Sequence, residues 1–238
     1  MKQPKIVSPA EWLAARERLL VKEKELTRHQ DALAAERRAL PWVRVDKAYR
    51  FEGDAGPQGL GDLFAGRSQL ITYHFMLGPG WKEGCPSCSL LADHVDGARV
   101  HLAARDVTLT LVSHAPFADI ATFRQRMGWR LPWVSSHGSD FNRDFHVSFT
   151  PDEVAAGAFY YNYASKGFPS EEGPGISVFA KDASGAVFHT YSTYARGAEP
   201  LIGAYCLLDM VPKGRDEEGL PWPMAWVRHH DRYGATAA

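Results

Sequence analysis

The first forty residues of the chain repeat an apolar side chain every seven positions. The repeat consists of Trp12, Leu19, Leu26, Leu33 and Leu40, and most residues between them are Lys, Arg, Glu or Ala. Ser8, followed by Pro9 and by Glu11, is typical of a helix start, and Pro41 would end the helix. The pattern therefore predicts one long helix in an N-terminal extension over residues 1–44.

The apolar stripe of this predicted helix is narrow. A coiled coil needs a second apolar position in each heptad, and here that position holds Ala15, Lys22, His29 and Glu36. A helix with a single apolar stripe usually packs that stripe against another surface. We therefore expect the helix to lie against the rest of the chain or against a second copy, which would make the protein a homodimer.

Beyond residue 42 the pattern changes to short apolar runs that alternate with helical stretches. The expected strands cover 69–76, 107–113, 133–136 and a hairpin at 176–180 and 186–191, and the expected helices cover 86–95, 116–127 and 198–210. Residues 52–62, which are rich in glycine, and residues 137–145 are expected to form loops. This alternation predicts an α/β fold with a mixed central sheet and right-handed crossovers.

These elements divide the chain into three parts. The helical extension covers 1–44, the α/β domain covers 45–212, and an aromatic tail covers 213–238. The sequence is 45% hydrophobic and contains seven Trp and twelve Phe, which is enough apolar material to fill a complete core. We expect the tail to pack on the domain.

Charge and the absence of long apolar runs exclude several partner classes. The formal net charge is −1, so no overall field would attract nucleic acid or an anionic membrane surface. No apolar stretch approaches the roughly 18 residues of a membrane span. The start, MKQPKIVSPAEW, has neither an apolar segment nor a cleavage site typical of secretion. We expect a cytoplasmic protein that binds neither nucleic acid nor membrane.

The sequence has three cysteines, and two of them form the run Gly84-Cys85-Pro86-Ser87-Cys88. This run follows a predicted strand and opens a predicted helix, whose free N–H groups and dipole stabilise a thiolate. Cys88 returns to the same side of the helix within one turn and can resolve a mixed disulfide. The spacing therefore predicts a redox-active dithiol in which Cys85 attacks and Cys88 resolves. Lys82 would favour the thiolate, whereas Glu83 would oppose it.

A zinc site is the main alternative chemistry for such a pair. Structural zinc needs four Cys or His ligands, usually supplied by two such pairs, and this chain has only one. His94 and His101 would lie on the opposite side of a continuous helix. Two inert core cysteines are disfavoured, because Pro-Ser between them indicates an exposed helix start. We expect no metal and no dissociable cofactor.

Five stretches of the sequence carry a family resemblance. They are GCPSCSLLAD, SHAPFADIATFRQRMGW, PWVSSHGSDFNRDF, FHTYSTYARG and LDMVPKGRDE. They resemble an uncharacterised bacterial family of predicted dithiol–disulfide oxidoreductases, and the match extends over most of residues 1–235. The resemblance implies a three-layer thioredoxin-like fold with a mixed central sheet and thiol–disulfide exchange at the cysteine pair.

The residues around the cysteine pair differ from those of peroxiredoxins and of thioredoxins. Peroxiredoxins place a proline seven residues and a threonine or serine three residues before the attacking cysteine, and here those positions hold Gly78 and Lys82. Thioredoxins place a cis-proline before a late strand, for which Pro174 is the nearest candidate. Their tryptophan directly precedes the first cysteine, whereas Trp81 lies four residues before Cys85. A thiol peroxidase and a non-catalytic redox-sensing or interaction protein therefore remain as alternatives.

The expected substrate is a disulfide-containing protein or a small-molecule thiol. The residues expected to line its cleft beside the two cysteines are Trp81, Lys82, Pro86, Ser87 and Pro174. Two further residues have less specific interpretations. Cys206, among apolar neighbours, is expected to be a buried core thiol, and His74, in a central strand, a hydrogen-bonded core histidine.

Overall fold

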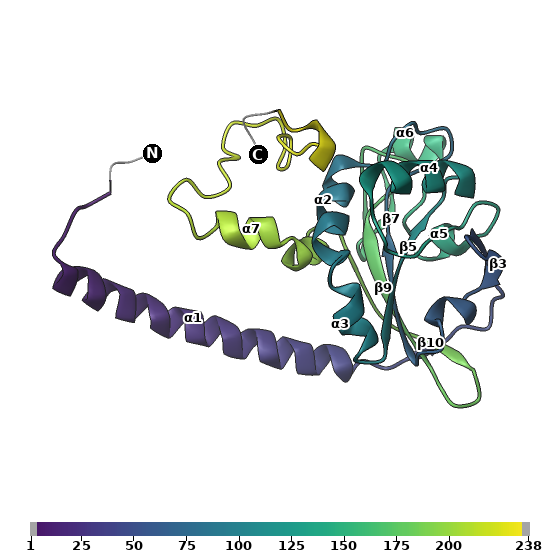
Figure 1. Cartoon of the computed structure of the whole chain (residues 1–238), viewed down its shortest axis with the longest axis horizontal. Coiled ribbons are helices and arrows are strands. Elements are labelled where there is room, and N and C mark those ends of the chain that lie inside the picture. The colour runs from purple at the N-terminus through teal and green to yellow at the C-terminus, as the bar shows by residue number, and fades with distance from the viewer. Residues whose placement is uncertain (1–3, 235–238) are drawn as a thin grey trace. The chain divides into compact units, whose positions relative to one another are not determined.

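A computed structural model describes residues 4–234, and these residues separate into two compact units, one on each side of the Pro41–Trp42 bond. The first unit contains one helix, α1 (Pro9–Arg38), shown in purple in Figure 1. The Ser8 hydroxyl accepts a hydrogen bond from the Glu11 N–H, and the Glu11 carboxylate accepts one from the Ser8 N–H, so both ends of a capping box are present. No residue of α1 is buried.

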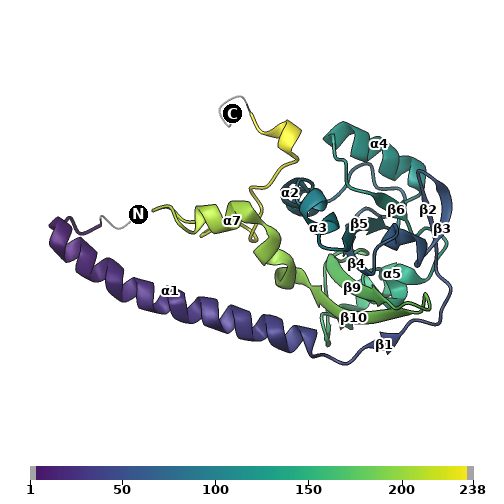
Figure 2. The same ribbon diagram turned by 60° about the horizontal axis from the view of Figure 1, so that its bottom comes forward.

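The second unit is built on an eight-stranded sheet, with strand order β1-β10-β9-β4-β5-β6-β2-β3 (Figures 1 and 2). The strands are β1 (Val43–Arg44), β2 (Arg50–Gly53), β3 (Gly56–Gly59), β4 (Gln69–His74), β5 (Val107–Ser113), β6 (Trp133–Ser135), β9 (Gly175–Lys181) and β10 (Val187–Tyr194). A separate two-stranded sheet contains β7 (Phe159–Tyr161) and β8 (Ala164–Lys166).

The helices of this unit lie between the strands and after the last of them. They are α2 (Pro86–Val95), α3 (Arg99–Ala103), α4 (Phe117–Met127), α5 (Phe141–Asp144), α6 (Pro151–Ala156) and α7 (Gly203–Leu208), with the 3-10 helices η1 (Asp62–Phe64), η2 (Ala195–Leu201) and η3 (His230–Arg232). No helix within residues 4–234 is long and apolar enough to cross a membrane.

The centre of the sheet mixes parallel and antiparallel pairs. β4 pairs in parallel with β5, which pairs in parallel with β6, and the connections pass through α2 and α4. On its other side β4 pairs antiparallel with β9, which continues as a hairpin into β10. A β-α-β crossover beside an antiparallel hairpin is a thioredoxin-like arrangement. The predicted α/β thioredoxin-like fold with a mixed sheet and a long N-terminal helix is confirmed.

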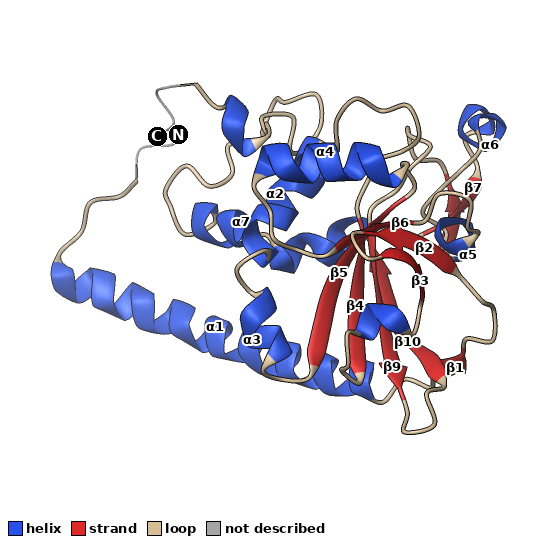
Figure 3. Ribbon diagram, turned by 45° about the vertical axis from the view of Figure 1, so that its right-hand side comes forward, coloured by secondary structure: helices blue, strands red, loops and turns tan. Residues whose placement is uncertain are grey.

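Two apolar clusters make the domain three layers deep (Figure 3). On one face of the sheet, Tyr73, Leu111 and Trp133 pack against α2 and α4. On the other face, Leu70 and Val112 pack against α5 and η1. The alternation of side chains along each strand directs neighbouring residues of β4 to opposite layers. Tyr73 therefore faces the helix that carries the cysteines.

Three local expectations were wrong. Residues 52–62 contain the β2–β3 hairpin rather than a glycine-rich loop, because Asp54 and Ala55 form a two-residue turn and Gly56, the first residue of β3, adopts the positive φ of 85° that closes it. The polar stretch 137–145 contains the short helix α5. The expected helix over 198–210 divides into η2 and α7, because Pro200 cannot continue a regular helix.

Candidate functional site

Cys85 lies at the N-cap of α2, directly after the loop that leaves β4. Its backbone N–H donates to the Met76 carbonyl over 3.0 Å, which ties it to the residues that follow the strand. Its own carbonyl accepts hydrogen bonds from the Ser89 N–H and the Ser89 hydroxyl, each over 2.9 Å. Pro86 fills the first helical position, where no N–H donor is needed. The backbone of the nucleophile candidate is thus fixed on both sides.

Gly84 brings this segment close to the aromatic core. A Cβ atom at this buried position would lie 2.4 Å from Cε1 of Phe75 and 2.8 Å from Cε1 of Phe123. The Gly84 carbonyl accepts a hydrogen bond from Nε2 of His229 over 2.8 Å, and Nδ1 of the same ring lies 3.3 Å from the Arg126 guanidinium. Only a residue without a side chain fits between these rings and the start of α2.

The two thiols have opposite electrostatic surroundings. Hydrogen bonding by the Cys88 thiol, by the backbone N–H groups of Cys88 and Ser87 and by the Ser87 side chain lowers the pKa of Cys85 from 9.0 to about 7, although burial opposes the shift. Burial raises the pKa of Cys88 well above 9.0, and the neighbouring Cys85 sulfur raises it further. Cys85 is partly exposed and Cys88 is buried, and neither is in a disulfide. Cys85 is the group suited to be a thiolate near neutral pH.

This difference predicts the pH dependence of alkylation. In a Cys206→Ser background, which removes the other accessible thiol, the rate of Cys85 modification by iodoacetamide is expected to rise with pH with a midpoint near 7. The rate rises with pH because the thiolate is the reactive form, and the lowered pKa of Cys85 makes that thiolate available at a lower pH than in a free cysteine. Peptide mapping of the modified protein measures both cysteines. Modification of Cys88 before Cys85, or a midpoint near 9, would contradict the assignment.

Tyr73 faces Cys88 from β4. The Tyr73 side chain is 3% exposed and forms a hydrogen bond with Cys88. Burial raises the pKa of Tyr73 well above 10.0, and the adjacent cysteine adds to this effect. Tyr73 therefore keeps its proton and can donate to the Cys88 sulfur. The sequence marked this strand as buried but contained no signal that its tyrosine contacts the thiol.

Both cysteines open onto one pocket of about 320 Å³. Most of its wall is apolar and comes from segments that are distant in sequence: Met76, Leu91, Phe168, Pro174, Ala195, Ala198, Ile202, Pro223 and Met224. Ser87, Tyr73 and Tyr205 also line the pocket, and Arg196 and Glu199 contribute charged groups. The pocket is therefore a candidate binding site for the molecule that reacts with Cys85.

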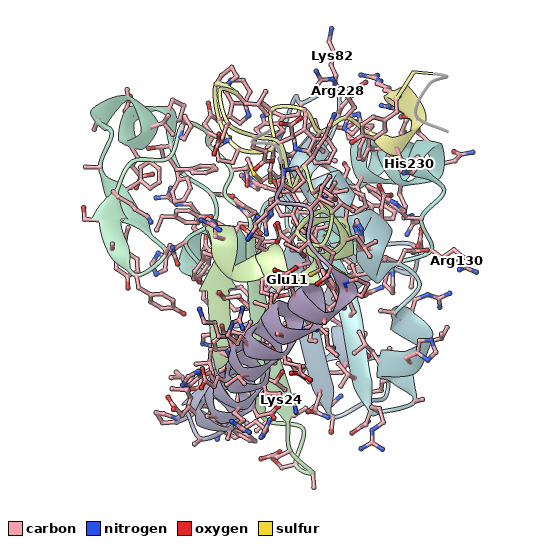
Figure 4. All side chains as sticks on the ribbon, turned by 90° about the vertical axis from the view of Figure 1, so that its left-hand side faces the viewer. Glu11, Lys24, Lys82, Arg130, Arg228 and His230 are labelled. Atoms are coloured by element: carbon pink, nitrogen blue, oxygen red, sulfur yellow. The ribbon has the colours of Figure 1, made fainter. Side chains whose placement is uncertain are left out.

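The structure brings only some of the expected cleft residues into this pocket. Ser87 and Pro174 line it together with the cysteines, whereas Pro86 is exposed on the outside of the helix start. Trp81 and Lys82 instead line a separate hollow beside Phe123 and Arg126 on α4. The reason is local, because the Trp81 N–H bonds to the Gly78 carbonyl and turns this loop away from the dithiol. Figure 4 shows Lys82 projecting outwards.

Pro174 precedes β9, as expected from the sequence, but its peptide bond is trans. Its carbonyl accepts a hydrogen bond from the Tyr161 hydroxyl over 2.8 Å. A Cβ atom on the following residue, Gly175, would lie 2.6 Å from the Tyr194 ring. The glycine after Pro174 thus permits a close contact between β9 and β10 beside the pocket.

Two other expectations have different outcomes. His74 is a buried core histidine, as predicted, whose Nε2 lies 2.9 Å from the Ser177 hydroxyl, and its ring packs near Phe141 and Phe145 on the layer opposite the cysteines. Cys206 is exposed rather than buried, because its place on α7 turns it away from Tyr205, which faces the core. Among the residues that the structure describes, no group of three or more His, Cys, Asp or Glu could hold a metal ion.

The C-terminal tail is the part of the site that sequence reasoning missed. Arg126 on α4 pairs with Glu83 and Asp231, and Arg232 also pairs with Glu83. His230 pairs with Asp93 on α2 over 2.7 Å. The tail thereby contacts both the loop before Cys85 and the helix after it. Its charged residues alone gave no signal of these partners, since each partner lies more than 100 positions away.

Several solved structures are similar to this chain at low sequence identity. Peroxidoxin BcpB from Mycobacterium tuberculosis is 13% identical, with a TM-score of 0.43, over 69% of this chain and 94% of that one. Peroxiredoxin Q from Xanthomonas campestris is 13% identical, with a TM-score of 0.42, over 68% and 96%. A putative thiol:disulfide interchange protein DsbE from Chlorobium tepidum is 13% identical, with a TM-score of 0.40, over 69% and 97%.

No curated protein matches the sequence. A protein family does match, over residues 1–233. This range includes the N-terminal extension, the cysteine pair and the C-terminal tail that contacts the cysteine loop. This agrees with the resemblance carried by the five sequence stretches. The chain belongs to the bacterial family of proteins of unknown function called DUF899.

Proposed function

We propose that this protein is a thiol–disulfide oxidoreductase in which Cys85 is the attacking thiol and Cys88 the resolving thiol. The observation that carries the proposal is the asymmetry of the pair. Cys85 is partly exposed at a helix N-terminus with a lowered pKa, and Cys88 lies buried behind it with a raised pKa. An attacking thiol needs access and thiolate character, whereas a resolving thiol needs proximity and protection from solution.

The reaction has two exchange steps. The Cys85 thiolate attacks one sulfur of a disulfide R–S–S–R, forming a Cys85–S–S–R bond and releasing R–S⁻, which takes up a proton. The Cys88 sulfur then loses its proton and attacks the Cys85 sulfur, releasing the second R–S⁻. The protein is oxidised by two electrons to the Cys85–Cys88 disulfide, and the substrate is reduced to two thiols. A dithiol reductant of the cell must restore the reduced protein.

The local groups support each step. The N–H groups of Ser87 and Cys88 stabilise the Cys85 thiolate before attack, and they would do so again when the Cys85–Cys88 disulfide is reduced and Cys85 is released as a thiolate. Tyr73 lies against the Cys88 sulfur and can stabilise the negative charge that develops there in the second step. No charged side chain is required at either sulfur. Such a cycle agrees with the reducing cytoplasm that the sequence suggests.

The experiment that tests this proposal is stoichiometric reduction. The fully reduced protein, carrying Cys206→Ser, is mixed with a small disulfide in the absence of any other thiol. One equivalent of disulfide is expected to be consumed for each protein, and peptide mapping is expected to show a Cys85–Cys88 bond. Consumption of hydrogen peroxide, but of no disulfide, would replace the proposal with a thiol peroxidase. Reaction with neither would indicate a non-catalytic role.

A further inference from the structure

The walls of the cysteine pocket indicate what can reach Cys85. The side chains of Met76, Leu91, Phe168, Ile202 and Met224 line the pocket together with the two cysteines, and none of them can form a strong hydrogen bond. A polar group placed against these five side chains would lose hydrogen bonds to water without replacing them. An alkyl group would instead leave water for an apolar surface, which is favourable.

The charged residues of the pocket are already paired. Among the described lining residues, Arg196 and Glu199 carry charge beside the Cys85 thiolate, and the Arg196 Nε donates to the Glu199 carboxylate over 2.8 Å. Arg215 donates to the same carboxylate over 2.7 Å. A charged substrate would have to compete with these ion pairs. Apart from the reacting Cys85 thiolate, the pocket therefore presents no unpaired charge that would favour a charged disulfide over a neutral one.

The C-terminal tail forms a roof over one side of the pocket through Pro223 and Met224. Glu217 holds this roof, because a single carboxylate oxygen accepts from the Met224 N–H over 2.8 Å, the Trp226 Nε1–H over 2.8 Å and the Tyr205 hydroxyl over 2.7 Å. The backbone of Met224 has φ of 68°, a conformation unfavourable for a residue with a side chain. The contacts of Glu217 hold Met224 in this conformation at the pocket wall.

A second attachment lies on the other side of the roof. His229 is 3% exposed and bonds to the carbonyl of Gly84, the residue before the nucleophile. Its ring also packs edge-on against Phe123 on α4. The roof is therefore fixed to Tyr205 of α7 through Glu217, and to the backbone of Gly84 through His229. A segment held at both ends cannot swing aside without breaking these contacts.

We propose that the substrates of this site are small apolar disulfides and that the roof excludes disulfides of folded proteins. This inference rests on the proposed exchange function and adds its substrate class. A pocket of about 320 Å³ is near the lower end of those that enclose small ligands, which span roughly 300–1,000 Å³. A folded protein cannot insert its surface into such a space, whereas a dialkyl disulfide with short chains fits. The sulfur pair would lie at Cys85, with the alkyl groups on the apolar wall.

A matched pair of substrates tests the preference. Dipropyl disulfide and bis(2-hydroxyethyl) disulfide have the same number of heavy atoms and differ in a terminal methyl or hydroxyl group. With a dithiol as the final reductant, kcat/KM is expected to be roughly tenfold or more higher for the dipropyl compound. Insulin, a protein disulfide, is expected to react more slowly than either. Equal rates for the two small disulfides, or faster reduction of insulin, would overturn the inference while leaving the exchange function intact.

Variants of the roof test its role. Glu217→Ala removes the common acceptor and is expected to raise the rate with insulin relative to dipropyl disulfide, whereas Glu217→Gln keeps an acceptor oxygen and is expected to restore the native ratio. Leu207→Ala, on the exposed face of α7, is the control and should leave the ratio unchanged. The circular dichroism spectrum of Glu217→Ala must match that of the native protein. If the ratio of the insulin rate to the dipropyl disulfide rate is then unchanged, the roof does not exclude protein disulfides.

Binding of compounds that cannot react tests the apolar site independently of the exchange chemistry. Dipropyl sulfide and bis(2-hydroxyethyl) sulfide cannot undergo exchange, so calorimetry with Cys85→Ser measures recognition alone. Tighter binding of dipropyl sulfide supports the apolar site whether or not the wild-type protein reduces disulfides. If the wild-type protein reduces none, only the proposed exchange chemistry is contradicted. Equal or undetectable binding of both compounds would sink the apolar site.

Discussion

Replacing Cys85 with serine is expected to lower disulfide turnover to the rate seen without protein, whereas replacing Cys88 with serine is expected to stop the reaction at a mixed disulfide. The first change removes the only thiol that has both access to the pocket and a lowered pKa. The second leaves the attack intact but removes the group that releases the product. The Cys88→Ser protein should therefore retain one R–S group on Cys85, which intact mass spectrometry detects.

The control for this pair is Cys206→Ser. Cys206 is exposed and can react with disulfides on its own, so all variants are compared in that background. The Cys206 change alone is expected to leave turnover unchanged because this residue does not line the pocket. Accumulation of the mixed disulfide on Cys88 in the Cys85→Ser protein, at a rate comparable to the wild type, would reverse the assigned order.

The second large effect is expected at Gly84. Gly84→Ala would place a methyl group against the rings of Phe75 and Phe123, at 2.4 Å and 2.8 Å from their nearest atoms. The rings pack against the tryptophans of the core, so they cannot move away freely. We expect a loss of about 1–3 kcal/mol in the free energy of unfolding, as for other overpacked cores. Urea denaturation followed by circular dichroism measures it.

The same change should affect the chemistry, because Gly84 is joined by peptide bonds to the loop and to the nucleophile. Displacement of the Cys85 backbone would weaken its hydrogen bonds with the N–H groups of α2, so the alkylation midpoint is expected to move above 7. Gly97→Ala is the control, because a Cβ atom there meets no atom within 4 Å. Unchanged stability and an unchanged midpoint in Gly84→Ala would show that the aromatic contacts tolerate the methyl group.

The parts of the molecule with strong local signals could be predicted from the sequence. The start of α1 is encoded in a capping box, β4 and β5 in runs of β-branched and aromatic residues, and the position of Cys85 in a strand followed by a proline at a helix start. In each case neighbouring residues determine the structure, so the pattern is visible without the fold. The cysteine pair and its helix are the clearest example.

The surroundings of the pair depend on contacts between distant segments. His229 bonds to the backbone carbonyl of Gly84, 145 positions earlier. Every residue has a backbone carbonyl, so the residue types in the sequence do not indicate which carbonyl His229 will contact. Trp81 and Lys82 are close to Cys85 in sequence, yet the turn at Gly78 places them in another hollow. Cys206 has apolar neighbours but lies on the exposed side of a helix of only six residues. Proximity in sequence was a poor guide to proximity at the site.

The bond between His229 and Gly84 also has a consequence for the order of events during synthesis. The cysteines leave the ribosome long before the tail that supplies His229 and Met224, and contacts of such long range form late in folding. Until residues 217–229 emerge, the two thiols lack their roof and are open to any disulfide in the surroundings. Docking of the tail is thus the step that would give the dithiol the proposed selectivity.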